Sequence, residues 1–248
     1  TFQVQRVKFD KVLADGVEKQ GVQIRYQHAL LSLDVTHKPL MTVEDQHQQQ
    51  YQIEADFVLD ASGFARVLPR LLDLEEPSTL PARKAIFTHI EDNISDINFD
   101  RNKILISVHP ENSEVWYWLI PFSNGTCSLG VVAKQEFFDT YAKDNIEALK
   151  QLVREESRLA VILADAEYPN PSGDILGYSA NVKQLCSDKF ALLGNAGEFL
   201  DPVFSSGVTI AMKSAQLASH LLVEKFSGKA INWEQQYPIH LAIKSEDL

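Results

Sequence analysis

What this sequence has little of excludes several classes of protein. In 248 residues it contains only 2 cysteines, Cys127 and Cys186, which stand far apart and lack the spacing of a metal site. This usage predicts buried free thiols and a protein of the reducing cytoplasm. The 7 histidines are scattered, with no pair at the helical spacing of metal ligands, so we expect no metal site.

Long apolar runs and basic clusters are also missing. No apolar segment is long enough to span a bilayer, and no signal peptide opens the chain. Lys and Arg total 23 against 34 Asp and Glu, which gives a net charge of -11. We therefore expect neither nucleic acid nor an anionic membrane as a partner. The 45% of apolar residues is typical of a soluble globular protein with an ample core.

The two ends of the sequence resemble internal segments of a protein. The chain begins with Thr1 rather than Met, and a helical pattern that starts near Ala242 runs to Leu248 without a stop signal. We therefore expect more chain on both sides.

Hydrophobic periodicity predicts three stretches of different character. The first should contain a helix over 7–20, strands near 22–26 and 30–36, a hairpin with a polar tip at 47–50, and a buried strand over 56–60. The second should contain four strands in a row, near 85–90, 104–109, 115–120 and 127–132, and then helices over 136–164. Strands in a run, without helices between them, indicate an antiparallel sheet. The third should contain an extended segment over 175–184, a strand over 190–193, and a helix from about Ser205 with an apolar stripe of Val208, Ala211, Ala215, Ala218 and Leu222.

The segment from Leu193 to Gly207 carries the strongest signal of a binding site. A buried strand runs into the small-residue turn Gly194-Asn195-Ala196-Gly197, and Pro202 and Gly207 then lead into a helix. Glycines let another backbone or a ligand approach closely, and free N–H groups at a helix start favour an anion or a polarised carbonyl. A tight strand-to-helix connection without a ligand would have the same spacing, so spacing alone leaves both interpretations open.

The full string is similar to the second FAD fingerprint of the para-hydroxybenzoate-hydroxylase superfamily. That fingerprint is Gly-Asp-Ala followed by Pro and, five residues later, Gly, and Pro202 and Gly207 have this spacing. The resemblance implies that Asn195 binds the ribityl chain of FAD, and that Gly194, Asp201, Pro202 and Gly207 belong to the same site. Asn195 departs from the usual Asp, and its amide keeps an acceptor while gaining a donor.

A second pattern is Trp116-Tyr117-Trp118-Leu119-Ile120-Pro121, whose alternation places Trp116, Trp118 and Ile120 on one face of a strand. Two tryptophans on a strand more often simply fill a core. These residues, however, resemble the Trp-x-Trp-x-Ile-Pro signature of flavin-dependent halogenases. The resemblance implies that Trp116 and Trp118 line the passage between flavin and substrate.

Three shorter matches support this resemblance. Arg6 stands in a Val-x-Arg-x-x-Phe-Asp string, which resembles a helix start where Arg contacts the cofactor; an exposed helix-cap arginine is the alternative. Asp60 and Gly63 stand in an Asp-Ala-Ser-Gly string, which resembles a segment packed near the dinucleotide; a plain strand-end turn is the alternative. Ser206 and Gly207 match the end of the family's Ser-Thr-Gly, whose amides hold chloride, which implies a halide site.

The motifs follow the order of the flavin-dependent, tryptophan-halogenase-like family. The resemblance implies an α/β protein, α+β overall, with an incomplete FAD/NAD(P)-binding Rossmann-like domain and an inserted, mainly antiparallel sheet domain. FAD-domain pieces are expected at 1–80 and 175–228, the substrate-side sheet and helices at 81–174, and the start of a helical region at 229–248. The Gly-x-Gly-x-x-Gly turn and the catalytic lysine are expected upstream of Thr1.

The function implied is that of an FAD-dependent halogenase-like monooxygenase. It would use reduced flavin from a separate flavin reductase, oxygen and a halide ion on a small, electron-rich aromatic substrate. Phe204 stands where indole-acting enzymes have Glu, which favours phenol- or pyrrole-type members. A flavin hydroxylase or geranylgeranyl-reductase-like oxidoreductase, and a non-catalytic flavoprotein, are the alternatives. We expect this chain alone to be inactive.

Overall fold

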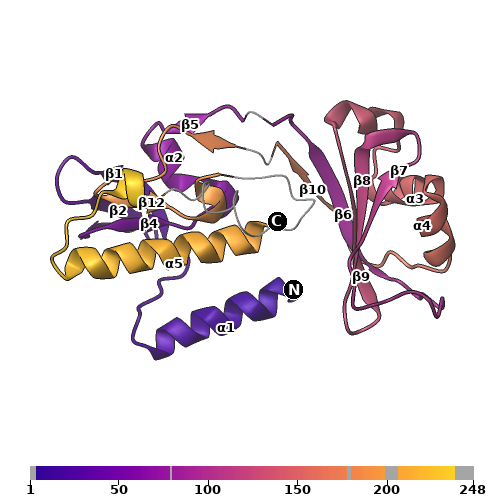
Figure 1. Cartoon of the computed structure of the whole chain (residues 1–248), viewed down its shortest axis with the longest axis horizontal. Coiled ribbons are helices and arrows are strands. Elements are labelled where there is room, and N and C mark those ends of the chain that lie inside the picture. The colour runs from indigo at the N-terminus through magenta and orange to yellow at the C-terminus, as the bar shows by residue number, and fades with distance from the viewer. Residues whose placement is uncertain (1–3, 79, 178–179, 199–205, 238–248) are drawn as a thin grey trace. The chain divides into compact units, whose positions relative to one another are not determined.

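The computed structural model describes residues 4–78, 80–177, 180–198 and 206–237 (Figure 1). The chain forms two compact units, Thr1–Val58 and Leu59–Leu248. Each unit is described by itself, and the domain boundaries expected near residues 80, 174 and 228 stay predictions.

The first unit contains one helix and one small sheet. Helix α1 (Arg6–Lys19) precedes strands β1 (Ala29–Asp34), β2 (Leu40–Glu44) and β3 (Gln50–Glu54), which pair antiparallel in the order β1-β2-β3. The hairpin between β2 and β3 turns at 45–49, as predicted. Four apolar side chains of α1 are exposed, those of Val7, Val12, Leu13 and Val17, and none of the helix's residues is buried.

The strand predicted near residues 22–26 is wrong. Residues 22–25 have no regular structure, and the chain turns at Tyr26 and Gln27, where the φ of Gln27 is 58°. A strand needs a neighbour to satisfy its backbone groups, and the sheet of this unit begins only at Ala29. The β-branched residues Val22 and Ile24 have a high strand propensity, but no strand of the described residues pairs with this segment.

The second unit contains a five-stranded antiparallel sheet in the order β10-β6-β9-β8-β7. Its strands are β6 (Lys84–Glu91), β7 (Leu105–His109), β8 (Asn112–Pro121), β9 (Thr126–Ala133) and β10 (Gly173–Leu176). The four consecutive strands and their antiparallel pairing are confirmed. The fifth comes from the returning extended segment, which pairs with β6 at the edge of the sheet.

Helices cover one face of this sheet (Figure 1). After the 3-10 helix η2 (Gln135–Thr140), α3 (Asn145–Glu155) and α4 (Ser157–Ile162) follow; Asp144 caps α3 by accepting from the N–H of Glu147 at 3.0 Å. Leu149, Leu152 and Leu159 from these helices are fully buried. They pack in one core with the odd-numbered β8 side chains Val115, Tyr117 and Leu119. The even-numbered side chains of β8 therefore face the other way.

The rest of the second unit contains short strands, turns and three α-helices among the described residues. Strand β12 (Phe190–Leu192) pairs with β4 (Val58–Asp60), and β11 (Asn181–Val182) pairs antiparallel with β5 (Glu75–Glu76). The turns and helices of this region are η1 (Gly63–Ala65), α2 (Val67–Leu71), η3 (Gly194–Ala196), α5 (Gly207–Phe226) and α6 (Trp233–Gln236).

The apolar stripe predicted for α5 is confirmed only in part. The buried positions are Ile210, Ser214, Ala218 and Leu221. Of the other predicted positions, Val208, Ala215 and Leu222 are half-buried and Ala211 is exposed. The prediction selected small apolar residues, but α5 packs with Ser214 inward because this hydroxyl accepts a hydrogen bond from a buried backbone N–H. The predicted helix start at Ser205 lies outside the described residues. The helix ends at Phe226, and Gly228 follows with a φ of 91°, as a helix-terminating glycine does.

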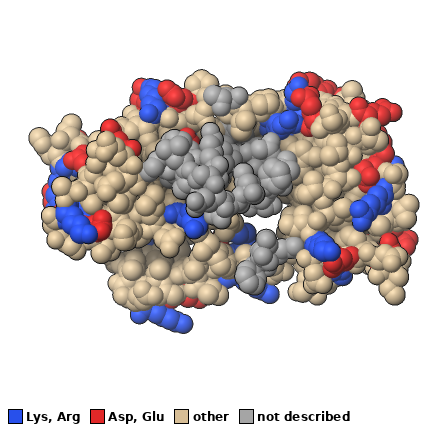
Figure 2. Space-filling model, viewed as in Figure 1, with Lys and Arg blue, Asp and Glu red and all other residues tan. Residues whose placement is uncertain are grey.

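The surface carries both signs of charge. On the face shown in Figure 2, acidic and basic side chains are interspersed. Among the helices that the structure describes, none is long and apolar enough to cross a membrane.

Candidate functional site

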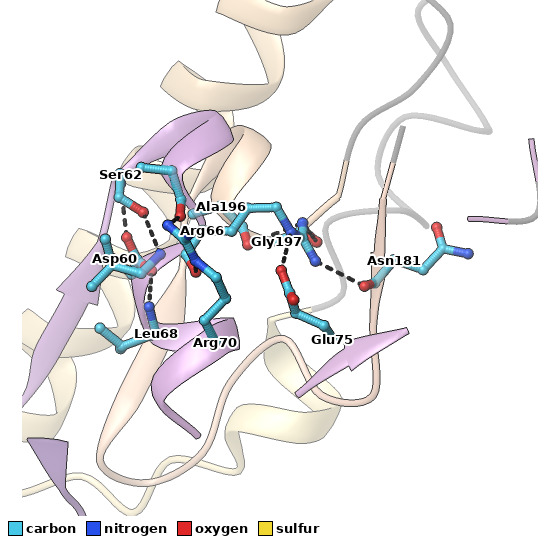
Figure 3. Close-up of polar contacts among 11 residues, drawn as sticks. Asp60, Ser62, Arg66, Leu68, Arg70, Glu75, Asn181, Ala196 and Gly197 are labelled. Atoms are coloured by element: carbon cyan, nitrogen blue, oxygen red, sulfur yellow. Dashed lines mark hydrogen bonds and ion pairs between the residues drawn. The ribbon is translucent and has the colours of Figure 1, made fainter. Parts of the chain in front are cut away.

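The turn after β4 is organised by the carboxylate of Asp60, which is 4% exposed. One carboxylate oxygen accepts from the N–H of Ser62 at 2.7 Å, and the other accepts from the N–H of Leu68 at 2.8 Å (Figure 3). The second bond satisfies a backbone donor at the start of α2. Gly63 opens η1 with a φ of 60°, a left-handed conformation that glycine adopts readily. Both oxygens of Asp60 are thus engaged within the turn, and its contact with a cofactor stays a prediction.

The turn after β12 lies beside the turn after β4. The N–H of Leu193 donates to the carbonyl oxygen of Asp60 at 2.8 Å, which joins the ends of the two strands. Gly194 has a φ of 52°, and a Cβ built on it would lie 3.0 Å from the Cβ of Ala211. The N–H of Gly194 donates to the hydroxyl of Ser214 at 3.0 Å. Helix α5 therefore packs directly on this turn, and only glycine permits the approach.

Asn195 is the residue of this turn that points to a ligand. Its side-chain oxygen Oδ1 is buried and has no hydrogen-bond partner among the described residues. A buried carbonyl oxygen without a donor costs about 1–3 kcal/mol, so native proteins seldom leave one unsatisfied. A ligand that brings a hydroxyl or N–H donor to Oδ1 would remove this cost. The predicted site residues Asp60, Gly63, Gly194 and Asn195 thus lie on two turns that the backbone bond between Leu193 and Asp60 joins.

The N-terminus of α5 is the third component. The helix has 20 residues, begins at Gly207, and has no acidic residue in its first turn. Ser206 stands at the N-cap, but its side chain makes no capping hydrogen bond. The positive end of the helix dipole is therefore not offset by a side chain of the first turn or of the N-cap. Asp201, Pro202 and Phe204 lie outside the described residues.

The two tryptophans lie on the same face of the sheet, as the alternation predicted, and this face is opposite the core helices. Trp116 is 8% exposed, and the Trp116 and Trp118 ring centroids are 6.0 Å apart. The indole N–H of Trp118 donates to the hydroxyl of Ser128 at 3.0 Å. Phe87 adds a third ring, with its centroid 6.1 Å from that of Trp118. These residues form one aromatic wall: Phe87, Trp116 and Trp118.

Arg6 lies in the other unit. Its guanidinium donates two hydrogen bonds to the Asp10 carboxylate, at 3.0 and 2.9 Å, and its side chain is 62% exposed. This is an i,i+4 ion pair on the surface of α1. The contact of Arg6 with a cofactor stays a prediction.

Sequence reasoning gave no role to two residues that hold this region together. Ser214 bonds the Gly194 turn from α5, and Arg66 donates to carbonyl oxygens of the same turn. Arg66 follows the Asp-Ala-Ser-Gly string, but the carbonyl oxygens that it binds in this turn lie 130 and 131 residues later in the sequence, so no local signal could identify them.

Comparison with known proteins places the chain in a family. The tryptophan halogenase family profile matches residues 1–238. A 1H-pyrrole-2-carbonyl-(peptidyl-carrier protein) chlorinase of Pseudomonas fluorescens is 29% identical over 235 residues, which cover 90% of this chain and 51% of the relative. The chain thus spans about half the length of this curated relative.

Solved structures agree with this assignment. A flavoprotein/dehydrogenase of Cytophaga hutchinsonii is 38% identical with a TM-score of 0.90, over 97% of this chain and 59% of that one. The myxobacterial chondrochloren halogenase CndH shares the fold at 23% identity and a TM-score of 0.82, over 96% of this chain and 55% of that one. The shared fold confirms the mixed α/β architecture with an antiparallel sheet. Because the family profile matches nearly the whole sequence, the chain belongs to the tryptophan halogenase family.

Proposed function

We propose that this protein is an FAD-dependent halogenase-like monooxygenase of the cytoplasm, acting on a small, electron-rich aromatic substrate. Its relatives include a carrier-bound pyrrole chlorinase, a carrier-bound pyrrole brominase and a tryptophan 2-halogenase, by their names. A halide ion and a separate flavin reductase are the other partners of the proposed reaction.

The residues of the described turns fit FAD. The ribityl chain of FAD carries hydroxyl groups, which are donors of the kind that the buried Oδ1 of Asn195 lacks. Gly194 and Ser214 fix this turn against α5, so Asn195 stands on a rigid support. A Cβ built on Gly207, at the helix start, would meet no atom of the described residues within 4 Å. Asn195, Gly194 and Gly207 would therefore hold the cofactor, and Arg6, Asp60, Gly63, Asp201 and Pro202 complete the proposed set.

Bound FAD would supply the activation of oxygen and the oxidising equivalents for halide. The chain's own part is to bind, orient and exclude water. At the N-terminus of α5, the N–H groups of Ser206 and Gly207 would hold a halide ion, since the helix dipole favours an anion there. The side chain of Ser206, at the N-cap, makes no hydrogen bond to the N–H groups of this helix end.

The aromatic wall is the observation that carries the halogenase proposal. Trp116 and Trp118 lie side by side on the sheet face away from the core helices, and Trp118 is fixed by its bond to Ser128. Flat apolar rings of this kind would contact a planar aromatic substrate and keep water away from it. The role of Trp116 and Trp118 in lining the path to the flavin belongs to this proposal.

A flavin oxidoreductase without halogenation is the second candidate. The Cytophaga hutchinsonii protein, 38% identical, is described as a flavoprotein/dehydrogenase. The two candidates differ in the fate of the halide and not in the cofactor.

The test uses the protein at its full natural length, with FAD, a flavin reductase, NADH, oxygen and bromide. A panel of indoles, phenols and pyrroles, the last both free and attached to a carrier protein, is analysed by mass spectrometry for brominated products. Bromination of an aromatic substrate, lost in a Trp118→Ala variant that still binds FAD, supports the proposal. Consumption of reduced flavin with only hydrogen peroxide released, on every substrate, would contradict halogenation and favour the second candidate.

A further inference from the structure

Arg66 stands at the centre of a buried polar cluster in the second unit. The residue is 8% exposed and separates η1 from α2 with a left-handed backbone, at φ 46° and ψ 52°. Its guanidinium donates to the carbonyl oxygens of Asn181 at 2.8 Å, Gly197 at 3.2 Å and Ala196 at 3.5 Å (Figure 3). It also donates to the carboxylate of Glu75 at 3.3 Å.

This arrangement is unfavourable unless all of its partners are in place. A left-handed conformation is disfavoured for a residue with a Cβ, and a buried guanidinium must be paired or hydrogen-bonded. The Glu75 carboxylate is 48% exposed and takes one of the bonds, so it offsets the charge only in part. Backbone carbonyl oxygens supply the remaining acceptors. Arg66 therefore holds three separate segments in one fixed arrangement.

Two of those carbonyl oxygens belong to the turn that presents Asn195. Ala196 and Gly197 follow Asn195 directly, and η3 ends between them. Within the turn, the N–H groups of Ala196 and Gly197 donate to the carbonyl oxygens of Leu193 and Gly194. The carbonyl oxygens of Ala196 and Gly197 themselves accept from Arg66. The guanidinium thus ties this turn to β11 and β5 through bonds that the strand pairing of β4 and β12 does not provide.

We propose that Arg66 is a positioning residue for the FAD-binding turn. Its guanidinium fixes Gly194–Gly197 against the segment that follows Asp60, so that Oδ1 of Asn195 keeps the place in which a ribityl hydroxyl can donate to it. The inference rests on the proposed function, because it assumes that FAD is the ligand of this turn. Neither the sequence motifs nor the known relatives assign a role to Arg66.

The chain offers a matched control in Arg101. Its guanidinium bonds both oxygens of Asp92, at 2.9 and 2.8 Å, and the carbonyl oxygens of Phe122 and Thr126, at 3.1 and 3.4 Å. The chemistry resembles that of Arg66, a carboxylate with backbone carbonyl oxygens, but it braces the five-stranded sheet instead of the Asn195 turn. Loss of Arg101 should therefore lower stability without touching the flavin turn.

The experiment compares Arg66→Met, Arg66→Lys, Glu75→Gln and Arg101→Met in the protein at its full natural length. For each, the midpoint of thermal unfolding is measured without FAD, and the Kd for FAD is measured by quenching of flavin fluorescence. We expect Arg66→Met to weaken FAD binding about tenfold or more, and Arg66→Lys to restore part of the affinity. Glu75→Gln should weaken it about two- to threefold, because Glu75 only orients the guanidinium. Arg101→Met should lower the midpoint and leave the Kd unchanged.

Each outcome decides the inference. Equal Kd values for wild type, Arg66→Lys and Arg66→Met would overturn it, and so would an equal weakening by Arg66→Met and Arg101→Met, which would indicate a general loss of folding. If Arg66→Met does not fold, the Lys variant and Glu75→Gln decide, because both keep a charged or polar group in place. Failure of the wild-type protein to bind FAD would overturn the proposed function as well. Tight binding by wild type with unchanged variants would overturn this inference alone.

Discussion

The indole ring of Trp118 lies against Gly130 of the neighbouring strand. A Cβ built on Gly130 would be 2.6 Å from ring atom Cε2 and nearer still to two other ring atoms. The two residues are paired in register between β8 and β9. The ring therefore lies flat on the sheet because its strand neighbour has no side chain, and the bond from the indole N–H to Ser128 fixes its orientation.

Gly130→Ala should displace Trp118. An added methyl group in this position forces the ring aside, and we expect a loss of about 1–3 kcal/mol in the free energy of unfolding, with a shift in tryptophan emission. The control is Gly16→Ala within α1. A Cβ there meets no atom of the described part of the chain within 4 Å, and the substitution should stabilise the helix by up to about 1 kcal/mol. Chemical denaturation measures both. A Gly130→Ala protein as stable as wild type would show that the ring is not held there.

Asn195→Ala should have opposite effects with and without FAD. Without the cofactor, the substitution removes a buried oxygen that has no partner in the described part of the chain. The free energy of unfolding should therefore stay the same or rise by up to about 1 kcal/mol. With FAD, the lost acceptor should weaken binding several-fold. Thermal unfolding of both forms and an FAD titration measure the two effects. Gln52→Ala, at an exposed amide side chain in β3, is the control and should change neither. A variant destabilised without FAD would mean that Oδ1 already has a partner.

Much of the fold could be predicted because its signals are local. Alternation along β8 identified Trp116 and Trp118 as one face and Tyr117 as the other, and the run of four strands predicted one antiparallel sheet. The glycines of the 194–197 turn indicated that another backbone or a ligand approaches closely, and the structure places α5 against Gly194.

What could not be predicted depends on partners far away in sequence. Ser214 faces inward because it meets the N–H of Gly194, 20 residues earlier, and no helical pattern of apolar residues contains that information. Arg66 is buried because carbonyl oxygens from residues 115 to 131 positions later surround it. The strand predicted near 22–26 failed for the same reason, since strand propensity does not supply a neighbouring strand.

Both cysteines should be unreactive in the folded protein. Cys127 and Cys186 are buried and free, and burial raises the pKa of Cys186 to about 11. Burial also raises the pKa of Cys127, and the hydrogen bond from its thiol to Asp92 raises this pKa further. Because the thiolate is the reactive form, iodoacetamide at pH 8 should label neither until denaturant is added, as peptide mass mapping can check. An exposed Ser32→Cys variant is the control and should react at once. Rapid native labelling of Cys186 would indicate that its surroundings open.

Stability should fall in acid through Asp92. Burial raises the pKa of this carboxyl, but hydrogen bonds from Arg101 and Cys127 outweigh burial and leave the pKa below its ordinary value. A lowered folded-state pKa means that Asp92 contributes stability above the unfolded-state pKa of about 4, and that this contribution is lost as pH falls through the folded value.

Asp92→Asn tests this linkage. At pH 7 the variant should lose about 1–3 kcal/mol, because Arg101 keeps its carbonyl partners and some solvent contact but loses its counter-charge. Between pH 5 and pH 3 the variant should lose less stability than wild type, since the titrating group is gone. Urea unfolding at several pH values measures both slopes, with the exposed Asp139→Asn as the control. If wild type and Asp92→Asn lose equal stability over this range, other carboxylates cause the acid sensitivity and the Asp92–Arg101 pair does not.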